Sequence, residues 1–288
     1  MDIPIIHLQF SSVDRSSSPP VATLLSSLRK GFPPAFRRAA GCAAEGGECG
    51  HGGDCPCKTV FGQELAADPA ALRRYQKPPL PFAFRLQQAN SDGGGEGLGL
   101  VLFGAAVTHL DLFVAAALDF LAPCSGGGWR VSAVAADGVL VAIPPGTSPA
   151  EFHSLPILSF DDLLEPCPGM VTEVTIELLS PVRLLQGGAP MRHIPFAPLA
   201  GALFRRISAM AYYYGGRELP FDFKWLASLA SQVACSRSEL VRTPSGVAGR
   251  VTYGGDLEEI LPFLSLGSLL NVGKGAAYGM GSYRILTP

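Results

Sequence analysis

The first half of the chain alternates between two hydrophobic periods, one typical of strands and one typical of helices. Apolar residues in Ile3–Phe10 recur with a period of two, which predicts a strand. Val107–Leu121 has a helical period with a single apolar stripe. The other predicted elements are a helix at Val21–Lys30 and strands at Pro81–Gln88, Leu98–Ala105, Trp129–Ala135 and Val139–Ile143. The order strand, helix, strand, strand, helix, strand is that of a ferredoxin-like domain.

The same order recurs in the second half, after a segment rich in proline and acidic residues (Pro144–Gly169) where we place the domain boundary. Thr172–Leu179 alternates as a strand does, and Phe196–Tyr214 has the apolar stripe of a helix. The remaining elements are expected at Glu239–Thr243, Val247–Tyr253, Leu257–Leu264 and Ser282–Leu286. The predicted fold class is therefore α+β, with two tandem ferredoxin-like (RRM-like) βαββαβ domains over residues 1–165 and 170–288.

The composition is that of a folded protein without a membrane span. Hydrophobic residues make up 48% of the chain and charged residues 16%, which argues against disorder. The longest uninterrupted apolar run, Leu98–Val107, is shorter than the roughly 20 residues a span needs. The start, Met1–Pro4, lacks the features of a signal peptide, and the odd number of cysteines, 7, fits a reducing compartment. We therefore expect a cytoplasmic protein with no membrane partner.

The net charge of −2 conceals an uneven distribution along the chain. Residues 1–90 carry 10 Lys and Arg against 7 Asp and Glu, and residues 171–288 carry 11 against 8. Residues 91–170 carry 1 against 9, so the acidity lies in the middle segment. Because binding to phosphates depends on a local basic face, the flanking regions permit a nucleic-acid partner.

A glycine-rich stretch precedes the last predicted strand. Gly273–Gly281 contains four glycines in nine residues, and such a bare backbone can approach another polymer with its N–H groups facing phosphates. Lys274 adds a positive charge there. A dinucleotide-binding loop would need glycine at Tyr278, and a Walker A loop would need serine or threonine after Lys274. A tight glycine turn with no ligand is the alternative.

The end of the chain resembles a known signature. Leu269–Val272, the glycine-rich stretch and Ser282–Ile285 together resemble the C-terminal signature of the CRISPR-associated RAMP superfamily, most closely its branch of endoribonucleases that process precursor CRISPR RNA. The likeness extends to Arg29–Arg38, Cys55–Phe61, Pro79–Phe84 and Thr175–Leu184. One departure is Asn271, because members often carry histidine just before the Val-Gly-Lys sequence, and asparagine cannot act as an acid or a base.

The resemblance implies a metal-independent endoribonuclease that binds CRISPR repeat RNA and cleaves it within repeats by 2′-hydroxyl attack, with no cofactor for catalysis. Other CRISPR effector subunits and a second copy in a homodimer are further expected partners. The alternative is a non-catalytic RAMP subunit that holds guide RNA inside an effector complex. A third hypothesis is a zinc-stabilised interaction protein with no RNA partner.

A Cys-rich insertion at about residues 41–60 offers metal ligands. Cys42, Cys49, Cys55 and Cys57 could hold a structural zinc ion, with His51 among them. Their spacing is not that of a zinc ribbon, and a loop of free thiols is the alternative.

The expected cleavage needs a base, an acid and a cation. His51 follows the N-terminal basic region, where the resemblance places catalytic residues, and it is a candidate provided that it does not bind zinc. Lys58 is the candidate cation, and His193, on a loop, is the second candidate histidine.

The predicted RNA contacts are basic residues and the glycine loop. Arg205 and Arg206 fall off the apolar stripe of their helix and are expected to face solvent or a partner. The full set is Arg37, Arg38, Arg205, Arg206, Gly273, Lys274, Gly275, Gly279 and Gly281.

Overall fold

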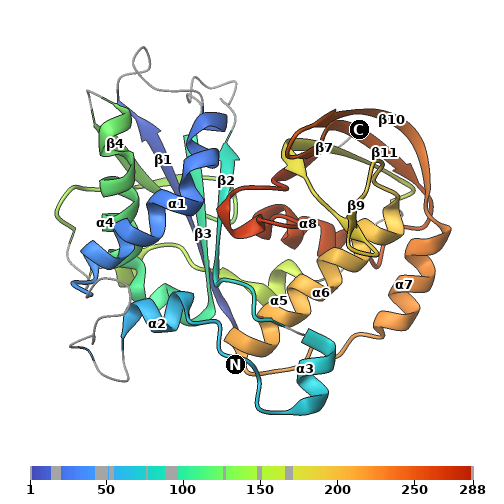
Figure 1. Ribbon diagram of the computed structural model, residues 1–288, viewed down its shortest axis with the longest axis horizontal. Coiled ribbons are helices and arrows are strands. Elements are labelled where there is room, and N and C mark those ends of the chain that lie inside the picture. The colour runs from blue at the N-terminus through green and yellow to red at the C-terminus, as the bar shows by residue number, and fades with distance from the viewer. Residues whose placement is uncertain are drawn as a thin grey trace.

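The computed structural model describes residues 2–13, 21–42, 51, 55–75, 77–87, 97–125, 128–147, 151–165 and 171–286. It contains two main β-sheets that lie side by side, with helices packed on each (Figure 1). The predicted boundary near residues 165–170 stays a prediction, because residues 166–170 lie outside the described part of the chain.

The N-terminal sheet has the ferredoxin-like strand order. Its elements are β1 (Pro4–Ser12), α1 (Val21–Ala39), β2 (Phe82–Gln87), β3 (Gly97–Phe103), α4 (Leu110–Leu121), β4 (Trp129–Val134) and β5 (Leu140–Ile143). The strands run in the order β2-β3-β1-β4-β5, and β6 (Leu158–Ser159) also pairs with β1. Two short helices, α2 (Pro56–Phe61) and α3 (Pro69–Tyr75), lie between α1 and β2, and a 3-10 helix (Gly104–His109) precedes α4.

The C-terminal sheet repeats this arrangement. Its elements are β7 (Glu173–Val182), α6 (Phe196–Gly215), α7 (Phe223–Gln232), β10 (Ala234–Thr243), β11 (Gly246–Gly254), α8 (Leu261–Leu270) and β12 (Tyr283–Leu286). The order β10-β11-β7-β12 matches β2-β3-β1-β4 of the first sheet, so the prediction of tandem ferredoxin-like domains is confirmed. The remaining elements are α5 (Phe160–Leu163), the hairpin of β8 (Leu185–Gln186) and β9 (Ala189–Pro190), and 3-10 turns at Ala122–Cys124, Glu151–Ser154 and Ala276–Tyr278.

Helix α1 is nine residues longer than predicted. It continues to Ala39 through Pro33 and Pro34, although proline removes helix hydrogen bonds. The extension buries Phe32 and Phe36 completely, and the Phe32 ring lies 4.8 Å from that of Phe84 on β2. Full burial of one such side chain is worth about 1.5–3 kcal/mol, so packing outweighs the cost of the prolines.

Helix α4 belongs to the core of the N-terminal domain. With the preceding 3-10 turn, the segment Gly104–Cys124 is long and apolar enough to cross a membrane by length and composition alone. Its residues Leu110, Phe113 and Leu121 are nevertheless buried in the same cluster as residues of α1 and of the sheet. A helix buried in a protein core satisfies the same test of length and composition as a membrane-spanning helix, and α4 is such a core helix.

The two domains share a continuous apolar core. Ile3 and Ile5 of β1, with Val101 and Phe103 of β3, belong to the same buried cluster as the helices and strands of the C-terminal domain. This is the face of β1 opposite to Leu8, which packs under α1 and α4. Strands β1 and β3 at the centre of the first sheet are therefore buried on both faces, by the helices of their own domain on one face and by the C-terminal domain on the other.

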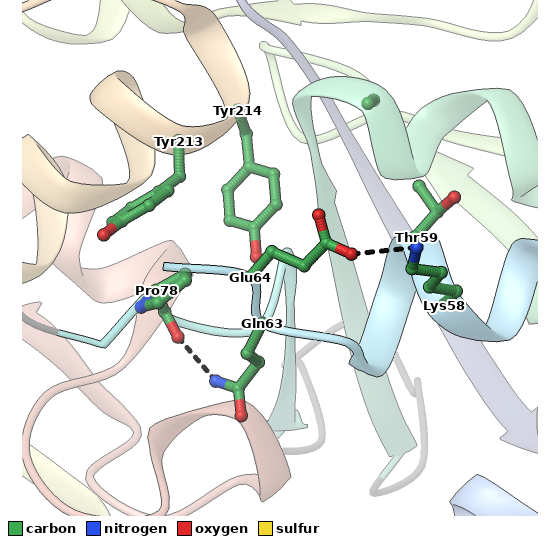
Figure 2. Close-up of a pocket in the computed structure, with 8 residues that line it drawn as sticks. Lys58, Thr59, Gln63, Glu64, Pro78, Tyr213 and Tyr214 are labelled. Carbon is green, nitrogen blue, oxygen red and sulfur yellow. Dashed lines mark hydrogen bonds and ion pairs between the residues drawn. The ribbon is translucent and has the colours of Figure 1, made fainter. Parts of the chain in front are cut away.

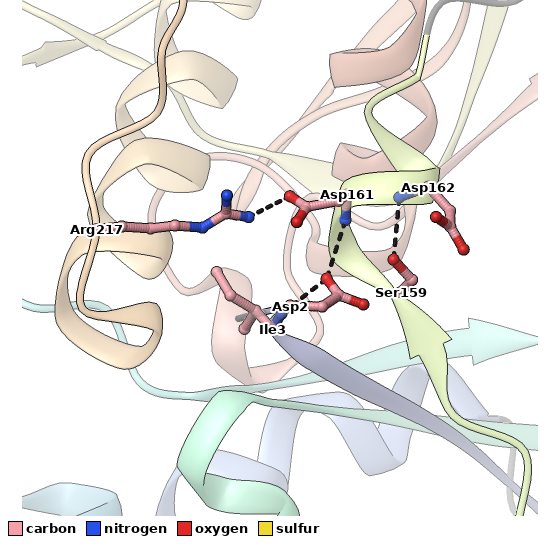
Figure 3. A network of polar contacts seen from close by, with 6 residues as sticks. All are labelled: Asp2, Ile3, Ser159, Asp161, Asp162 and Arg217. Carbon is pink, nitrogen blue, oxygen red and sulfur yellow. Dashed lines mark hydrogen bonds and ion pairs between the residues drawn. The ribbon is translucent and has the colours of Figure 1, made fainter.

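A polar network ties the start of the chain to this junction (Figure 3). One carboxylate oxygen of Asp2 accepts from the backbone N–H of Ile3 at 2.8 Å and of Asp161 at 3.3 Å. Arg217, which follows α6, pairs with the Asp161 carboxylate, and the Ser159 hydroxyl caps α5 by accepting from the Asp162 N–H. The network fixes β1 and α5 against the end of α6.

Asn271 fastens the C-terminal loop to the N-terminal sheet. Its side chain is fully buried, and its amide donates to the carbonyl of Phe84 at 2.6 Å and to that of Ala276 at 2.8 Å. The residue adopts a φ of 59° and a ψ of 171°, a combination that is rare for residues other than glycine and that costs backbone strain. The amide of Asn271 therefore serves as a structural link between the two domains.

Replacing Asn271 with alanine is expected to lower the free energy of unfolding by about 2–4 kcal/mol, because buried carbonyls lose their donors. Urea denaturation would measure the change. Ser231→Ala, at an exposed position of α7, serves as the control and should change stability by less than about 0.5 kcal/mol. Equal stability of Asn271→Ala and wild type would contradict the linking role.

Candidate nucleic-acid interface and active site

The glycine loop packs inside the molecule more than the sequence suggested. Gly279 and Gly281 are buried, and their N–H groups donate to the carbonyls of Ala276 and Pro181. A Cβ at Gly279 would lie 2.4 Å from Leu25 of α1. In this structure the bare backbone of these two glycines serves contacts within the chain, and the RNA contacts predicted for them stay predictions.

The rest of the loop is more accessible. Lys274 is exposed, and Gly273 and Gly275 on either side of it are partly exposed. The Lys274 N–H donates to the carbonyl of Arg183 at 3.0 Å, so the loop lies against the end of β7. The RNA contacts predicted for these three residues stay predictions.

Arg206 is also misplaced by the sequence prediction. Its Nε donates to the carbonyl of Leu270 at 2.9 Å, and its Nη2 is buried without a partner. Burial lowers the pKa of the guanidinium to about 10. Arg206 is therefore half-buried between α6 and α8 and is not fully exposed as predicted, because the buried surface of α6 is wider than its apolar stripe. The neighbouring Arg205 is exposed as expected.

The two arginines at the end of α1 differ in their surroundings. Arg38 is exposed and pairs with Asp119 of α4, with 2.5 Å between Nη2 and Oδ2. Arg37 is half-buried. Because an exposed ion pair is worth about 0–1 kcal/mol, a phosphate could compete for Arg38. Their contact with RNA stays a prediction.

Lys58 lines a pocket formed by both domains (Figure 2). The pocket has a volume of about 330 Å³, and Tyr213 and Tyr214 from the end of α6 border it opposite α2. The Lys58 ammonium lies 3.0 Å from a carboxylate oxygen of Glu64. Tyr214 donates its hydroxyl to the carbonyl of Pro79, and burial raises its pKa. The pocket therefore presents a cation beside aromatic rings.

His51 lies with two cysteines at the start of α2. Its Nδ1 is 4.0 Å from the sulfur of Cys42, which in turn is 3.6 Å from the sulfur of Cys55. Cys57 is not in this group; its side chain packs against the N-terminal core. Among the four cysteines predicted to bind zinc, Cys49 lies outside the described residues. His51, and not Cys57, lies with Cys42 and Cys55.

A second pocket, of about 470 Å³, has a basic lining. Arg183, Arg192 and Arg242 contribute to its wall, and none of its lining residues is acidic. The Nε of Arg183 is buried without a partner. His193 follows Arg192 and is exposed, so this candidate histidine belongs beside the basic pocket.

Sequence reasoning missed this basic pocket because its arginines stand alone in the chain. The pairing of strands assembles two of them. Val247 on β11 pairs with Arg242 on β10 and with Val182 on β7, whose neighbour is Arg183. Single arginines at the ends of predicted strands could have indicated the basic pocket. The sequence prediction instead chose pairs of adjacent basic residues.

The predicted catalytic residues do not form one site. His193 precedes α6, whereas the Lys58 pocket contacts Tyr213 at the far end of that helix. At 1.5 Å of rise per residue, the helix places these ends about 25 Å apart. His51 and Lys58 are both neighbours of Cys55, however, because the His51 ring lies within 4.8 Å of the Cys55 sulfur and the Lys58 N–H donates to the Cys55 carbonyl at 2.9 Å.

Comparisons with known proteins agree with this architecture. Residues 176–283 match the family model of the CRISPR-associated endoribonuclease Cas6. Over this C-terminal part the chain is similar to the Cas6 family. A second family model, described as an N-terminal domain, matches residues 7–133. The two matches fall on the two sheets.

Solved structures of Cas6 proteins share the fold. A Cas6 product complex is 17% identical, covers 99% of both chains and has a TM-score of 0.51. A mutant of another Cas6 protein is 14% identical, covers both chains completely and has the same TM-score. At these identities the likeness establishes the fold alone. Among curated proteins, no sequence matches this chain.

His7, another histidine of the chain, is structural. It lies buried on β1, and burial together with the charge of Arg85 lowers its pKa to about 3. The imidazole is therefore neutral in the folded protein at any pH above that value.

His7 predicts a loss of stability in mild acid. Because its pKa is lower in the folded state than in the unfolded state, the unfolded chain binds the extra proton below about pH 6.5. Stability should fall by up to about 1.4 kcal/mol per pH unit between pH 6 and 5 from this group. Urea denaturation at several pH values should show a flatter dependence in His7→Gln, while the exposed His193→Gln keeps the wild-type slope. If the free energy of unfolding depends on pH equally in the wild type and both variants, His7 is not the buried neutral group responsible for the loss of stability.

Proposed function

We propose that this chain binds CRISPR repeat RNA and cleaves it within the repeat without a catalytic metal ion. The ribose 2′-oxygen attacks the adjacent phosphorus and the bond to the 5′-oxygen of the next nucleotide breaks. The products are a 2′,3′-cyclic phosphate and a free 5′-hydroxyl, and the proton lost by the nucleophile balances the proton gained by the leaving group. The observation that carries the proposal is the pocket between α2 and α6, where exposed Lys58 faces two tyrosines in a chain that matches the Cas6 model.

Lys58 is proposed to stabilise the negative charge that develops on the phosphate in the transition state. Its present partner does not prevent this role. The side chains of Lys58 and Glu64 are 60% and 73% exposed, and such a pair contributes at most about 1 kcal/mol. A phosphate oxygen that enters the pocket can therefore replace the Glu64 carboxylate.

The predicted histidines take different places in this proposal. His51 precedes α2, seven residues before Lys58 in the chain, and it can act as an acid or base only while its imidazole is not bound to a metal. His193 lies about 25 Å from the Lys58 pocket, by the length of α6. We therefore propose that His193 contacts RNA near the arginine pocket and takes no part in the chemical step.

The arginine pocket is proposed to bind the RNA backbone. Guanidinium groups bind phosphate oxygens with paired hydrogen bonds, and three of them surround this pocket. The unpartnered Nε of Arg183 supplies a donor that a phosphate could satisfy. Exposed Lys274, which lies against the carbonyl of Arg183, adds a further positive charge.

Cleavage of a repeat RNA in magnesium-free buffer with EDTA tests the reaction. We expect a cyclic-phosphate end, and we expect Lys58→Ala to slow single-turnover cleavage about 100-fold while RNA affinity changes little. Lys224→Ala, an exposed lysine on α7, is the matched control and should cleave normally. A strict need for magnesium, or unchanged cleavage by Lys58→Ala, would contradict the mechanism. Binding without cleavage by the wild type would favour the non-catalytic subunit.

The arginine pocket makes a separate prediction for binding. In the double variant Arg192→Ala/Arg242→Ala, the slope of log affinity against log salt should fall by about 2, because each phosphate contact contributes about 1. Arg237→Ala removes an exposed arginine of β10 that pairs with Glu239 and should leave the slope unchanged. Equal slopes for the wild type and the double variant would show that RNA does not occupy this pocket.

A further inference from the structure

The group of Cys42, His51 and Cys55 has the dimensions of a metal site. A tetrahedral zinc ion with bonds of about 2.3 Å to sulfur and about 2.0 Å to nitrogen places two sulfurs about 3.8 Å apart and a sulfur and a nitrogen about 3.6 Å apart. The structure has 3.6 Å between the two sulfurs and 4.0 Å between the Cys42 sulfur and Nδ1. All three ligand atoms lie within 4.8 Å of one another.

The donors suit zinc better than other common ions. Two thiolates and an imidazole are the ligands of structural zinc, whereas magnesium and calcium prefer oxygen. Two thiolate charges would balance those of a divalent cation. The sulfurs of Cys42 and Cys55 are 3.6 Å apart, well beyond the roughly 2.05 Å of a disulfide, so no disulfide joins these two residues.

The backbone holds two of the ligands in place. The Cys42 N–H donates to the carbonyl of Arg37 at 3.0 Å, which anchors it to the last turn of α1. Cys55 is 6% exposed and precedes α2, where its carbonyl accepts from the N–H groups of Lys58 and Thr59. A bound ion would therefore join the end of one helix to the start of the next.

We propose that Cys42, His51 and Cys55 bind a structural zinc ion that clamps the end of α1 to the start of α2. Two consequences follow. The His51 imidazole, with Nδ1 on the metal, is withdrawn from acid–base chemistry. The ion also fixes the helix that carries Lys58, and this second consequence rests on the proposed function. Cys57 is not a ligand.

Metal analysis of purified protein tests the site without RNA. Wild-type chain, purified in reducing buffer and passed over a desalting column, should contain about one zinc ion, released by a mercurial reagent that displaces thiolates. Cys42→Ser and Cys55→Ser should each retain less than a tenth of it. His51→Ala should weaken zinc binding about 10–100-fold in competition with a chromogenic chelator, because one ligand of the set is lost. The matched controls Cys57→Ser and Cys235→Ser should retain the ion.

A second measurement is independent of whether the cysteine variants fold. Cobalt added to the metal-free wild type should give thiolate charge-transfer bands and the visible absorption of a tetrahedral ion. The proposal is overturned if the purified wild type contains no zinc and gives no such bands with cobalt. It is also overturned if Cys57→Ser loses zinc while Cys42→Ser retains it. A thiol titration that finds Cys42 and Cys55 oxidised to a disulfide also overturns it. Zinc without RNA cleavage would contradict the proposed function alone, and cleavage by a zinc-free wild type would contradict the clamp alone.

Discussion

The burial of β1 and β3 on both faces is the constraint on which the rest of the structure depends. The helices α1 and α4 cover one face, and the C-terminal domain covers the other through a shared apolar core. Because close-packed cores do not deform continuously, the relative position of the domains is fixed. That fixed position brings Tyr213 and Tyr214 of α6 to the Lys58 pocket and holds the Asn271 amide on β2.

Hydrophobic periodicity was sufficient to predict the two ferredoxin-like units. In strands such as Ile3–Phe10 and Thr172–Leu179, successive side chains point to opposite faces of the sheet. The resulting hydrophobic pattern with a period of two can be read from a few neighbouring residues. The prediction stopped α1 at Lys30 because proline is a local signal against a helix, whereas the burial of Phe32 and Phe36 is a tertiary effect. Helix α7 was missed although the Asp222 carboxylate caps it by accepting from the N–H groups of Lys224 and Trp225, and an aspartate before a helix is a signal that the sequence does contain.

The candidate site was less predictable, since it depends on distances that the sequence does not carry. Arg205 and Arg206 are neighbours, yet Arg205 is exposed and Arg206 is half-buried against α8. His193 and Lys58 looked equally suited to catalysis, but α6 separates them. The arginine pocket draws on β7, β10 and the loop before α6, so that only the pairing of strands assembles it.

The glycine-rich loop has a consequence for what its motif can report. A Cβ at Gly281 would lie 1.8 Å from the carbonyl oxygen of Val272, and one at Gly273 would lie 2.7 Å from that of Arg183. A larger residue at either position is excluded by the architecture itself, whether or not any ligand ever reaches the surface. Selection for folding alone would therefore preserve these glycines in a descendant that had lost its activity. The glycine motif therefore reports that a chain has this fold. Evidence that the chain is an active enzyme has to come from other residues.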